Sequence, residues 1–193
     1  MMYTYNMSSI RHGFTLIELL VVLSIISVLA TVIVASLNSS REKSKINQTA
    51  VQIQELHKAA DFYRIDTGEV VPNTCGLSCT ESTDPLQTNV NSIPGWYGPY
   101  FPVSLVDFTH QWGGHMTVRS GNVDTSDPDI EMYVFLDDDA PGTSSSDNSG
   151  IIPNEAIQEI DSMLDDGDLE TGNLRGMGQF FTAPVGEFVF IIE

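Results

Sequence analysis

Positive charge is scarce in this sequence of 193 residues. Eight Lys and Arg residues face 26 Asp and Glu residues, which gives a formal net charge of −18. The deficit lies downstream, because residues 65–193 contain only Arg119 and Arg175 against 22 acidic residues. Such a region repels phosphate, so we expect it to make no contact with nucleic acid. The excess of carboxylates favours bound cations, or a surface that charge keeps from self-association.

Catalytic motifs and cysteines are also rare. The sequence contains no nucleophile elbow, no phosphate-binding loop and no metal-hydrolase motif, so we predict that the protein is not an enzyme. The two cysteines, Cys75 and Cys79, stand four residues apart. In an exported domain we expect them to form a local disulfide. The alternatives are a metal site, for which two further ligands at suitable spacing are missing, and a pair of free thiols.

Two further absences mark the first third of the chain. Neither Pro nor Gly occurs at residues 14–64, so nothing predicts a kink in a helix there. No charged residue occurs from Leu19 to Leu37, a run of 19 residues. As a helix this run is roughly 28 Å long, enough to cross the hydrocarbon core of a bilayer. Glu18 stands just inside the apolar stretch, where an unpaired charge costs on the order of 2.5–3.5 kcal/mol in lipid.

The segment Gly-Phe-Thr-Leu-Ile-Glu-Leu-Leu-Val-Val at residues 13–22 resembles the type IV pilin superfamily, which includes the pseudopilins of type II secretion. In that family a prepilin peptidase cuts after the Gly that ends a hydrophilic leader and N-methylates the new terminus. The resemblance implies a leader of residues 1–13, cleavage between Gly13 and Phe14, and methylation of Phe14. It also implies that Glu18, the fifth mature residue, neutralises the ammonium of a neighbouring subunit, which makes its burial tolerable.

Two other interpretations of this segment compete with processing. One is an uncleaved signal anchor in which Glu18 reaches the membrane interface. The other is a secretory signal peptide, which fits worse because its apolar core would span only about 7–15 residues and precede the cut. Arg41, Lys43 and Lys45 follow the span, and a positive-inside count places them in the cytoplasm. The leader motif gives the opposite orientation, and we adopt it: a single-pass protein of the inner or cytoplasmic membrane with its head outside, later part of an extracytoplasmic filament.

The rest of the chain agrees with the pilin-like α+β fold that the resemblance implies, a long N-terminal hydrophobic helix packed against a small antiparallel β-sheet. We divide the chain into the leader 1–13, an assembly half of the helix at 14–37, an amphipathic half at 38–66 and a globular acidic head at 67–193. Apolar residues recur at three- and four-residue spacing in the amphipathic half. They are Ile46, Ala50, Ile53, Leu56, Ala60 and Tyr63. Gly68 is placed to end the helix in the left-handed conformation.

In the head, alternating or continuous apolar residues predict strands at 115–120, 131–136 and 187–192, and a short helix is expected at 153–164. The aromatic segment 95–102 is expected to pack on the amphipathic half of the long helix. Its Gly-Pro-Tyr, followed by Trp-Gly at 112–113, resembles the major, G-type pseudopilins, although His110 and Gln111 replace the usual Asp-Pro. We interpret His110 and His115 as structural residues rather than metal ligands.

Two acidic loops are candidate calcium sites. Carboxylates about 4 Å apart repel each other by roughly 1 kcal/mol in water and by about 4 kcal/mol at an effective dielectric near 20, and a hard cation reverses this cost. The resemblance to G-type pseudopilins implies calcium in an acidic loop late in the head, at the position of the first loop. The alternative is a solvated acidic surface with capping turns. The candidate ligands are Asp137, Asp138 and Asp139 after a strand, and Asp165, Asp166 and Asp168 after the short helix.

The function that this resemblance implies is structural. We expect copies of the chain to polymerise through residues 14–37 into a type II secretion pseudopilus or a surface type IV pilus. The expected partners are further copies of the chain, the prepilin peptidase, an inner-membrane assembly platform and minor pilins. A function of another class stays open, namely a membrane-anchored, calcium-dependent binding protein or adhesin that does not polymerise.

Overall fold

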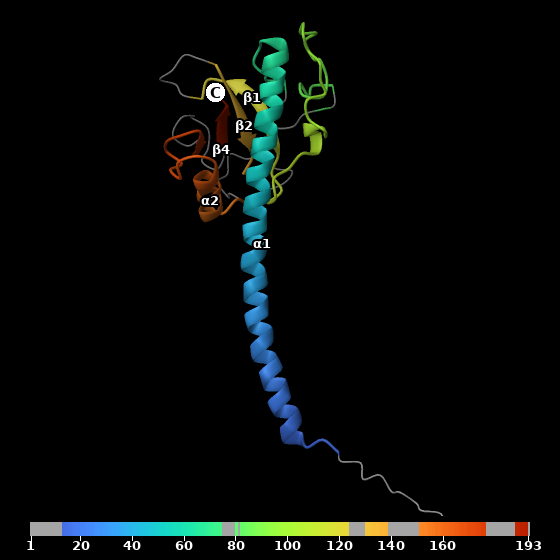
Figure 1. The fold of residues 1–193 in the computed structure, drawn as a ribbon, viewed down its shortest axis with the longest axis vertical. Coiled ribbons are helices and arrows are strands. Elements are labelled where there is room, and N and C mark those ends of the chain that lie inside the picture. Colours follow the sequence, from blue (N-terminus) through green and yellow to red (C-terminus); the bar gives the residue numbers. More distant parts are fainter. Residues whose placement is uncertain are drawn as a thin grey trace, which may run out of the picture. The chain divides into compact units, whose positions relative to one another are not determined.

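The computed structural model describes residues 13–74, 80, 82–123, 130–138, 151–176 and 188–192 (Figure 1). The chain falls into two compact units, Met1–Arg41 and Glu42–Glu193. Helix α1, Leu16–Thr67, contributes to both. The second unit adds the short 3₁₀ helix η1, the helix α2 and four strands. Their bounds are η1 Leu105–Asp107, β1 Met116–Gly121, β2 Glu131–Leu136, α2 Asn154–Leu164, β3 Leu174–Gly176 and β4 Phe188–Ile192.

The described part of the first unit is the start of helix α1 and the three residues before it. The helix begins at Leu16, two residues after the predicted start, and ends at Thr67, one residue beyond the predicted end. Every residue from 13 to 41 whose burial is described is exposed. A helix segment that is apolar all round and is exposed at every residue whose burial is described needs lipid or other helices around it.

The second half of α1 buries one face in the head, as its apolar spacing predicted. Ile53 and Leu56 are fully buried, and burial of such a side chain stabilises the fold by about 1.5–3 kcal/mol. The helix ends as expected at Gly68, whose φ of 72° is left-handed and whose N–H donates to the Arg64 carbonyl at 2.8 Å. The buried residues of this face are Ile46, Thr49, Ala50, Ile53, Leu56, Ala59, Ala60 and Tyr63.

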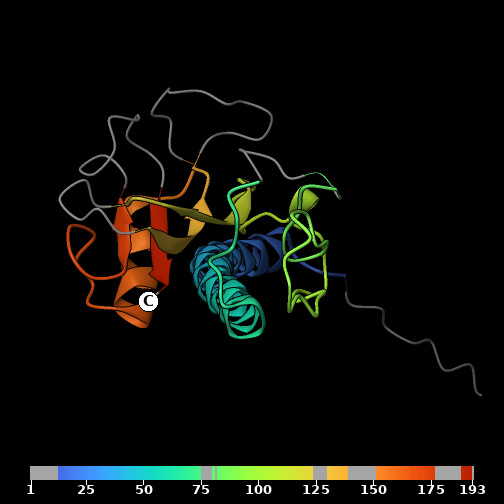
Figure 2. The same cartoon turned by 90° about the horizontal axis from the view of Figure 1, so that it is seen from above.

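The strands form one antiparallel sheet in the order β1-β2-β4-β3, so the predicted α+β class is confirmed (Figure 2). Val134 of β2 lies opposite Val118 of β1 on one side and opposite Phe190 of β4 on the other. The predicted strands are shifted by at most one residue. The three-residue β3 was not predicted, and it adds a fourth strand at the β4 edge.

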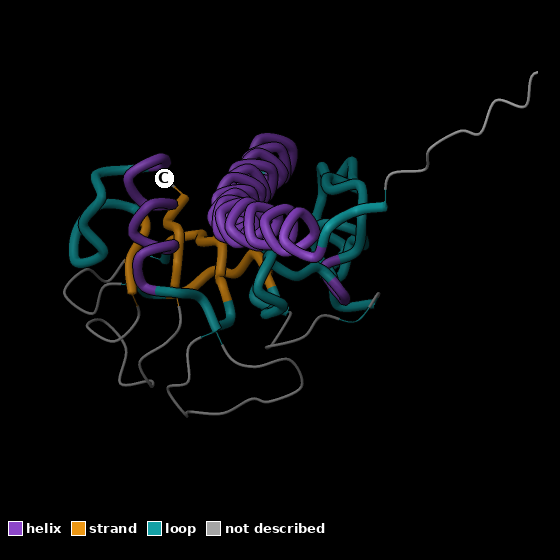
Figure 3. Tube along the Cα trace, turned by 90° about the horizontal axis from the view of Figure 1, so that it is seen from below, coloured by secondary structure: helices purple, strands orange, loops and turns teal. Residues whose placement is uncertain are grey.

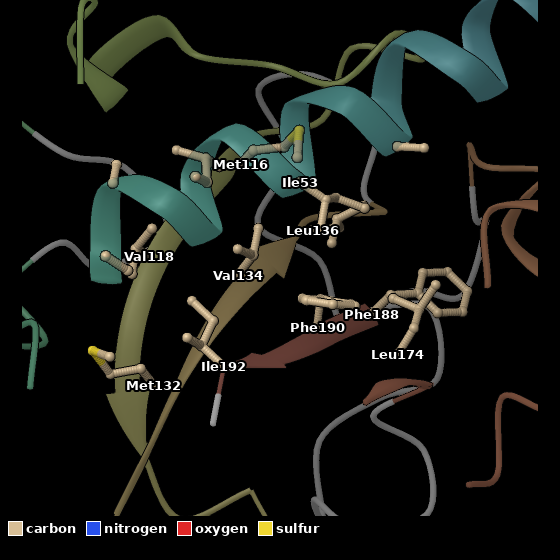
Figure 4. Packing of buried hydrophobic residues seen from close by; sticks show 14 of the residues in the cluster. Ile53, Met116, Val118, Met132, Val134, Leu136, Leu174, Phe188, Phe190 and Ile192 are labelled. Atoms are coloured by element: carbon tan, nitrogen blue, oxygen red, sulfur yellow. The ribbon is translucent and has the colours of Figure 1, made fainter. Parts of the chain in front are cut away.

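Helices α1 and α2 both lie on one face of this sheet (Figures 2 and 3). Alternate residues of the strands face the helices and form a single core with Ile53 of α1 and Ile157 and Ile160 of α2. Figure 4 shows part of this core. The intervening residues Tyr133, Phe135, Val189 and Ile191 form a second buried cluster with Val123. The strand residues that face the helices are Met116, Val118, Met132, Val134, Leu136, Leu174, Phe188, Phe190 and Ile192.

The aromatic loop packs on α1, as predicted. The Tyr100 ring lies edge-on to the rings of Tyr63 and Trp96, at centroid distances of 5.5 and 5.6 Å. Asp84, which is fully buried, holds this loop together. Its carboxylate accepts hydrogen bonds from the Leu86 and Leu105 backbone N–H groups at 3.0 and 2.7 Å.

Candidate functional site

The N-terminus of α1 places Glu18 in a reciprocal hydrogen-bonded cap. The backbone N–H and the hydroxyl of Thr15 both donate to Oε2 of Glu18, at 2.8 and 2.7 Å. The Glu18 N–H points back to the Thr15 hydroxyl at 3.3 Å. This is a capping box, in which Thr15 precedes the first helical turn and Glu18 is its third residue. The Thr-x-x-Glu spacing before an apolar run signals it in the sequence, but the role of Thr15 was missed there.

The predicted cleavage position lies immediately before this cap. Gly13 and Phe14 are non-helical, and a Cβ placed on Gly13 would meet no atom within 4 Å. The Phe14 side chain is 86% exposed. A peptide bond that lies outside a helix and in open space is accessible to the active site of a peptidase. Residues 1–12 of the expected leader lie outside the described residues.

The helix beyond Glu18 presents a continuous apolar surface. Its large side chains from Leu19 to Leu37 are about half exposed or more, and α1 is long and apolar enough to cross a membrane. Three hydroxyls in this stretch are satisfied within the helix: those of Ser24, Ser27 and Thr31 donate to backbone carbonyls three or four residues back, at 2.7 to 2.8 Å. Satisfied hydroxyls are compatible with lipid, where unbonded polar groups are costly.

Comparison with known families decides the class of this segment. The prokaryotic N-terminal methylation motif matches residues 8–34, which include the cleavage position, the cap and the start of the apolar helix. This match and the relatives described next support the resemblance of the chain to the type IV pilin and pseudopilin superfamily. Among the described residues, α1 is the one helix long and apolar enough to cross a membrane, which fits a membrane-anchored subunit.

Among relatives, this pilin-like chain is similar to the type II secretion system core protein G of Pectobacterium carotovorum subsp. carotovorum, with 30% identity over 47% of the chain and 59% of the relative. The core protein G of Xanthomonas campestris pv. campestris is 27% identical over 72% of the chain and 87% of the relative. The type IV wide pilus major component PilA4 of Thermus thermophilus is 34% identical over 34% of the chain and 50% of the relative. The chain thus spans only about three fifths of the length of the first of these relatives. No solved structure matches it significantly.

In the head, the first acidic loop begins in a buried, hydrogen-bonded setting. Asp138 follows β2 with only 4% of its surface exposed, and its Oδ1 accepts a hydrogen bond from the Ile152 N–H. No described His, Cys, Asp or Glu completes a group of three metal-ligating atoms with Asp137 or Asp138. Asp139 lies outside the described residues, as do Cys75 and Cys79. Calcium at this loop and the disulfide therefore stay predictions.

His110 is a structural residue of the turn before β1. Its ring accepts the Trp112 N–H at Nδ1, at 3.2 Å, and this fixes the proton on Nε2, which donates to the Asp137 carbonyl at 2.7 Å. Burial lowers the pKa of His110, and the neighbouring His115 lowers it further. The histidine thus ties the Trp-Gly turn to the end of β2 in its neutral form.

The second acidic loop is stabilised by its own carboxylates. Asp165 Oδ2 accepts the backbone N–H groups of Asn173 and Leu174. Asp166 accepts the Asp168 N–H at 2.9 Å and the Thr171 hydroxyl at 2.8 Å, and both bonds lower its pKa. Asp168 in turn accepts the Glu170 N–H at 3.1 Å. These contacts fold the chain after α2 back towards β3.

The structure adds one acidic residue that the sequence interpretation missed. Asp161, in the last turn of α2, is fully buried, and one of its carboxylate oxygens lies within 4.8 Å of an oxygen of Asp165 and of Asp166. Burial first, and the charges of Asp166 and Asp165 next, raise the pKa of Asp161 to about 6. Asp161 follows Ile157 by four residues, so its place on the apolar face of the helix was a signal in the sequence.

Proposed function

We propose that this chain is a prepilin-type filament subunit, processed after Gly13 and assembled through the apolar half of α1 into a type II secretion pseudopilus or a closely related pilus. The observation that carries the proposal is the placement of Glu18 at the start of an exposed apolar helix, directly after an accessible Gly13–Phe14 bond. The similarity to type II secretion system core protein G supports the pseudopilus.

Processing explains why a carboxylate stands at this position. Cleavage after Gly13 leaves an ammonium on Phe14, about one helical turn from Glu18. Among the described residues, both donors to the Glu18 carboxylate belong to Thr15 and both reach Oε2. Oε1 is therefore open to the ammonium of a neighbouring copy. Pairing the two charges removes the cost of placing either one alone among apolar helices.

These features suggest how the subunit passes from the membrane into the filament. We propose that it waits in the inner or cytoplasmic membrane with the head outside, where prepilin peptidase cleaves it and methylates Phe14. An assembly platform and minor pilins then add it to a homopolymer whose core is formed by residues 14–37. Its role is structural rather than catalytic. A non-polymerising, membrane-anchored binding protein is the alternative, and it requires neither cleavage nor a partner for Glu18.

Mass spectrometry of the protein from its native cells tests this proposal. We expect a mature chain that begins with N-methylated Phe14 and that is recovered in a sheared filament fraction. Replacement of Glu18 by Ala should remove the chain from that fraction while cleavage continues. Glu42→Gln is the matched control, because Glu42 lies in the same helix but forms an exposed ion pair with Lys45 at 3.1 Å. A mature chain that retains Met1, or Glu18→Ala filaments as abundant as those of the wild type, would contradict the proposal.

A further inference from the structure

We propose that Lys43 and Lys45 of α1, together with the turn at residues 111–114, form a docking surface for the phosphates of anionic lipids at the membrane that α1 leaves. The inference rests on the membrane anchor proposed above, and it does not depend on polymerisation. It gives a use to the basic residues after the span, which a positive-inside count assigns to the cytoplasm although the head is expected outside.

Positive charge is concentrated at this point of the chain. Three of the eight Lys and Arg residues occur at positions 41–45, where Glu42 is the only acid. Residues 65–193, by contrast, contain two basic residues against 22 acidic ones. Electrostatic forces at a membrane surface fall off over about 8 Å at physiological ionic strength. An anionic bilayer therefore attracts residues 41–45 and repels the acidic head beyond them.

Helix α1 brings both lysines to the level of the lipid headgroups. It is assigned as one helix from Leu16 to Thr67, and Lys43 and Lys45 follow Leu37, the last residue of the apolar run, by six and eight residues. These spacings correspond to roughly 9 and 12 Å along the axis. Side chains lean towards the N-terminus of a helix, which is the membrane side here, and an extended lysine shortens both distances by a few Å. Because the headgroup layer is about 5–7 Å thick, the two ammonium groups can reach it.

The two lysines also lie on either side of the face that carries the head. Ile46 is the first residue of this buried face. Successive residues of a helix are about 100° apart, so Ile46 is about 60° from Lys43 in one direction and about 100° from Lys45 in the other. A bilayer surface that meets both lysines therefore lies under the head rather than to one side of it.

The turn at residues 111–114 holds Lys45 in this position. The Lys45 ammonium lies 5.7 Å from the centroid of the Trp112 ring and 3.1 Å from Oε1 of Glu42. Trp112 packs against the core, and the Gln52 side chain donates to the Thr109 carbonyl at 3.1 Å, which ties this part of the chain to α1. An ammonium group has three donors, so donors are left for a phosphate oxygen. The lysine is thus ordered before any lipid binds to it.

Reconstitution of the full-length protein into vesicles tests the docking surface. Vesicles of phosphatidylcholine, alone or with about a third of phosphatidylglycerol, receive a trace of lipid that is spin-labelled on its headgroup and quenches nearby tryptophans. Trp112 should be quenched more in the anionic vesicles, and high NaCl should remove the difference. Trp96 is the internal control, because it packs on Tyr100 and through it on Tyr63, which is roughly 27 Å beyond Lys45 along α1.

The wild type gives the summed signal of both tryptophans, and the variants Trp96→Phe and Trp112→Phe separate the two. The anionic lipid should change the signal of Trp96→Phe, which keeps Trp112, and leave that of Trp112→Phe unchanged. Because the difference must also appear in the wild type, the result does not depend on the folding of either variant.

A charge variant and its control complete the experiment. Lys43 is exposed, and Lys43→Gln leaves the contact between Lys45 and Trp112 in place. It should lower the ratio of docked to free heads about fivefold, the effect of one lysine near an anionic surface. Lys58→Gln removes the same charge from an exposed position of the same helix, roughly 20 Å beyond Lys45, and should dock as the wild type does.

The proposal is overturned if Trp112 is quenched equally in both kinds of vesicle, or if Lys43→Gln retains the full difference. It is overturned as well if the quenching depends on the number of protein copies per vesicle rather than on lipid charge, since the acidic head of a second copy then covers the lysines. Flotation of the vesicles reports insertion separately. A protein that floats with both compositions but shows no difference contradicts the docking surface alone, whereas one that floats with neither contradicts the membrane anchor too.

Discussion

Glu18 and Thr15 are joined in both directions, because Thr15 donates two hydrogen bonds to Oε2 of Glu18 and receives the Glu18 N–H at its hydroxyl. The residue for which we propose a role in assembly is thus also part of the cap at the start of helix α1. The two roles are compatible, since the cap uses one carboxylate oxygen and leaves the other. A well-formed first turn would hold that oxygen in a fixed direction for a neighbouring subunit.

Loss of the Thr15 side chain should loosen this first turn. We expect Thr15→Ala to cost about 0.5–2 kcal/mol of local helix stability, because an N-cap hydroxyl and its reciprocal bond to Glu18 are removed. Hydrogen exchange of the full-length protein in micelles, read by mass spectrometry, should show faster exchange of the amides at residues 16–19.

Thr15→Ser is the matched control, since it keeps the hydroxyl and should exchange at the wild-type rate. Amides in the head should exchange alike in all three proteins. Equal exchange at residues 16–19 in Thr15→Ala and the wild type would show that the cap does not stabilise the helix start.

The elements that could be predicted from the sequence are those in which burial of a face requires apolar residues at a regular spacing. The buried face of α1 follows the three- and four-residue spacing of Ile46, Ala50 and Ile53, and β2 alternates because its two faces meet different clusters. The continuous apolar run of β4 was interpreted correctly as buried on both faces, and all five of its residues are buried.

The parts that escaped prediction depend on contacts between distant residues or on very short segments. Strand β3 has three residues, too few for an alternating pattern, and its pairing with β4 defines it. The closure of the loop after α2 depends on Asp165 reaching Asn173, which no local spacing signals. Asp161 was missed for another reason: an acid is seldom fully buried, so its place on the apolar face of α2 led to no prediction.

Truncation of Ile53 should destabilise the head strongly. Ile53 is fully buried between α1 and the sheet (Figure 4), and Ile→Ala at such a site costs about 2–5 kcal/mol through lost burial and the cavity that remains. The measurement is urea unfolding of the full-length protein in micelles, followed by the fluorescence of Trp96 and Trp112, which pack against the core. A lower midpoint is expected.

Val51→Ala is the control for this experiment. Val51 lies two residues earlier in the same helix but is 52% exposed, so its truncation should change the free energy of unfolding by no more than about 0.5 kcal/mol. If the two variants unfold at the same urea concentration, α1 does not pack on the sheet through the face described above.

Acidification should weaken the turn that His110 holds. Burial lowers the pKa of His110 below 6.5, so the unfolded chain binds a proton more readily than the folded one. The stabilising contribution of neutral His110 is therefore complete above about pH 6.5 and is lost as the pH falls towards the folded pKa. Asp161, whose pKa is raised to about 6, changes stability in the opposite direction over part of this range.

The variant His110→Gln separates the contribution of His110 to the pH dependence of stability from that of Asp161. His110→Gln cannot take up a proton, so its melting temperature should fall less than that of the wild type between pH 7.5 and pH 5, whatever the difference at neutral pH. Both proteins retain Asp161 and His115, and their contributions cancel in the comparison. Parallel pH profiles for the two proteins would rule out a neutral His110 as a source of stability.

The turn before β1 lies so close to the end of β2 that Gly114 should tolerate no side chain. A Cβ on Gly114 would lie 1.8 Å from the Asp137 carbonyl oxygen and 2.5 Å from His110 Nε2. Both of these atoms belong to the hydrogen bond that ties the turn to the sheet. Gly114→Ala should therefore separate these two atoms and lower the free energy of unfolding by about 1–3 kcal/mol or more, as overpacking of a closed site does.

Gly121, at the C-terminal end of β1, provides the comparison, since a Cβ there meets nothing closer than Tyr133 Oη at 3.5 Å. Thermal unfolding of the two variants in micelles should show a lower midpoint for Gly114→Ala and little change for Gly121→Ala, and the reverse order would mean that the Trp-Gly turn does not lie against β2 in this way.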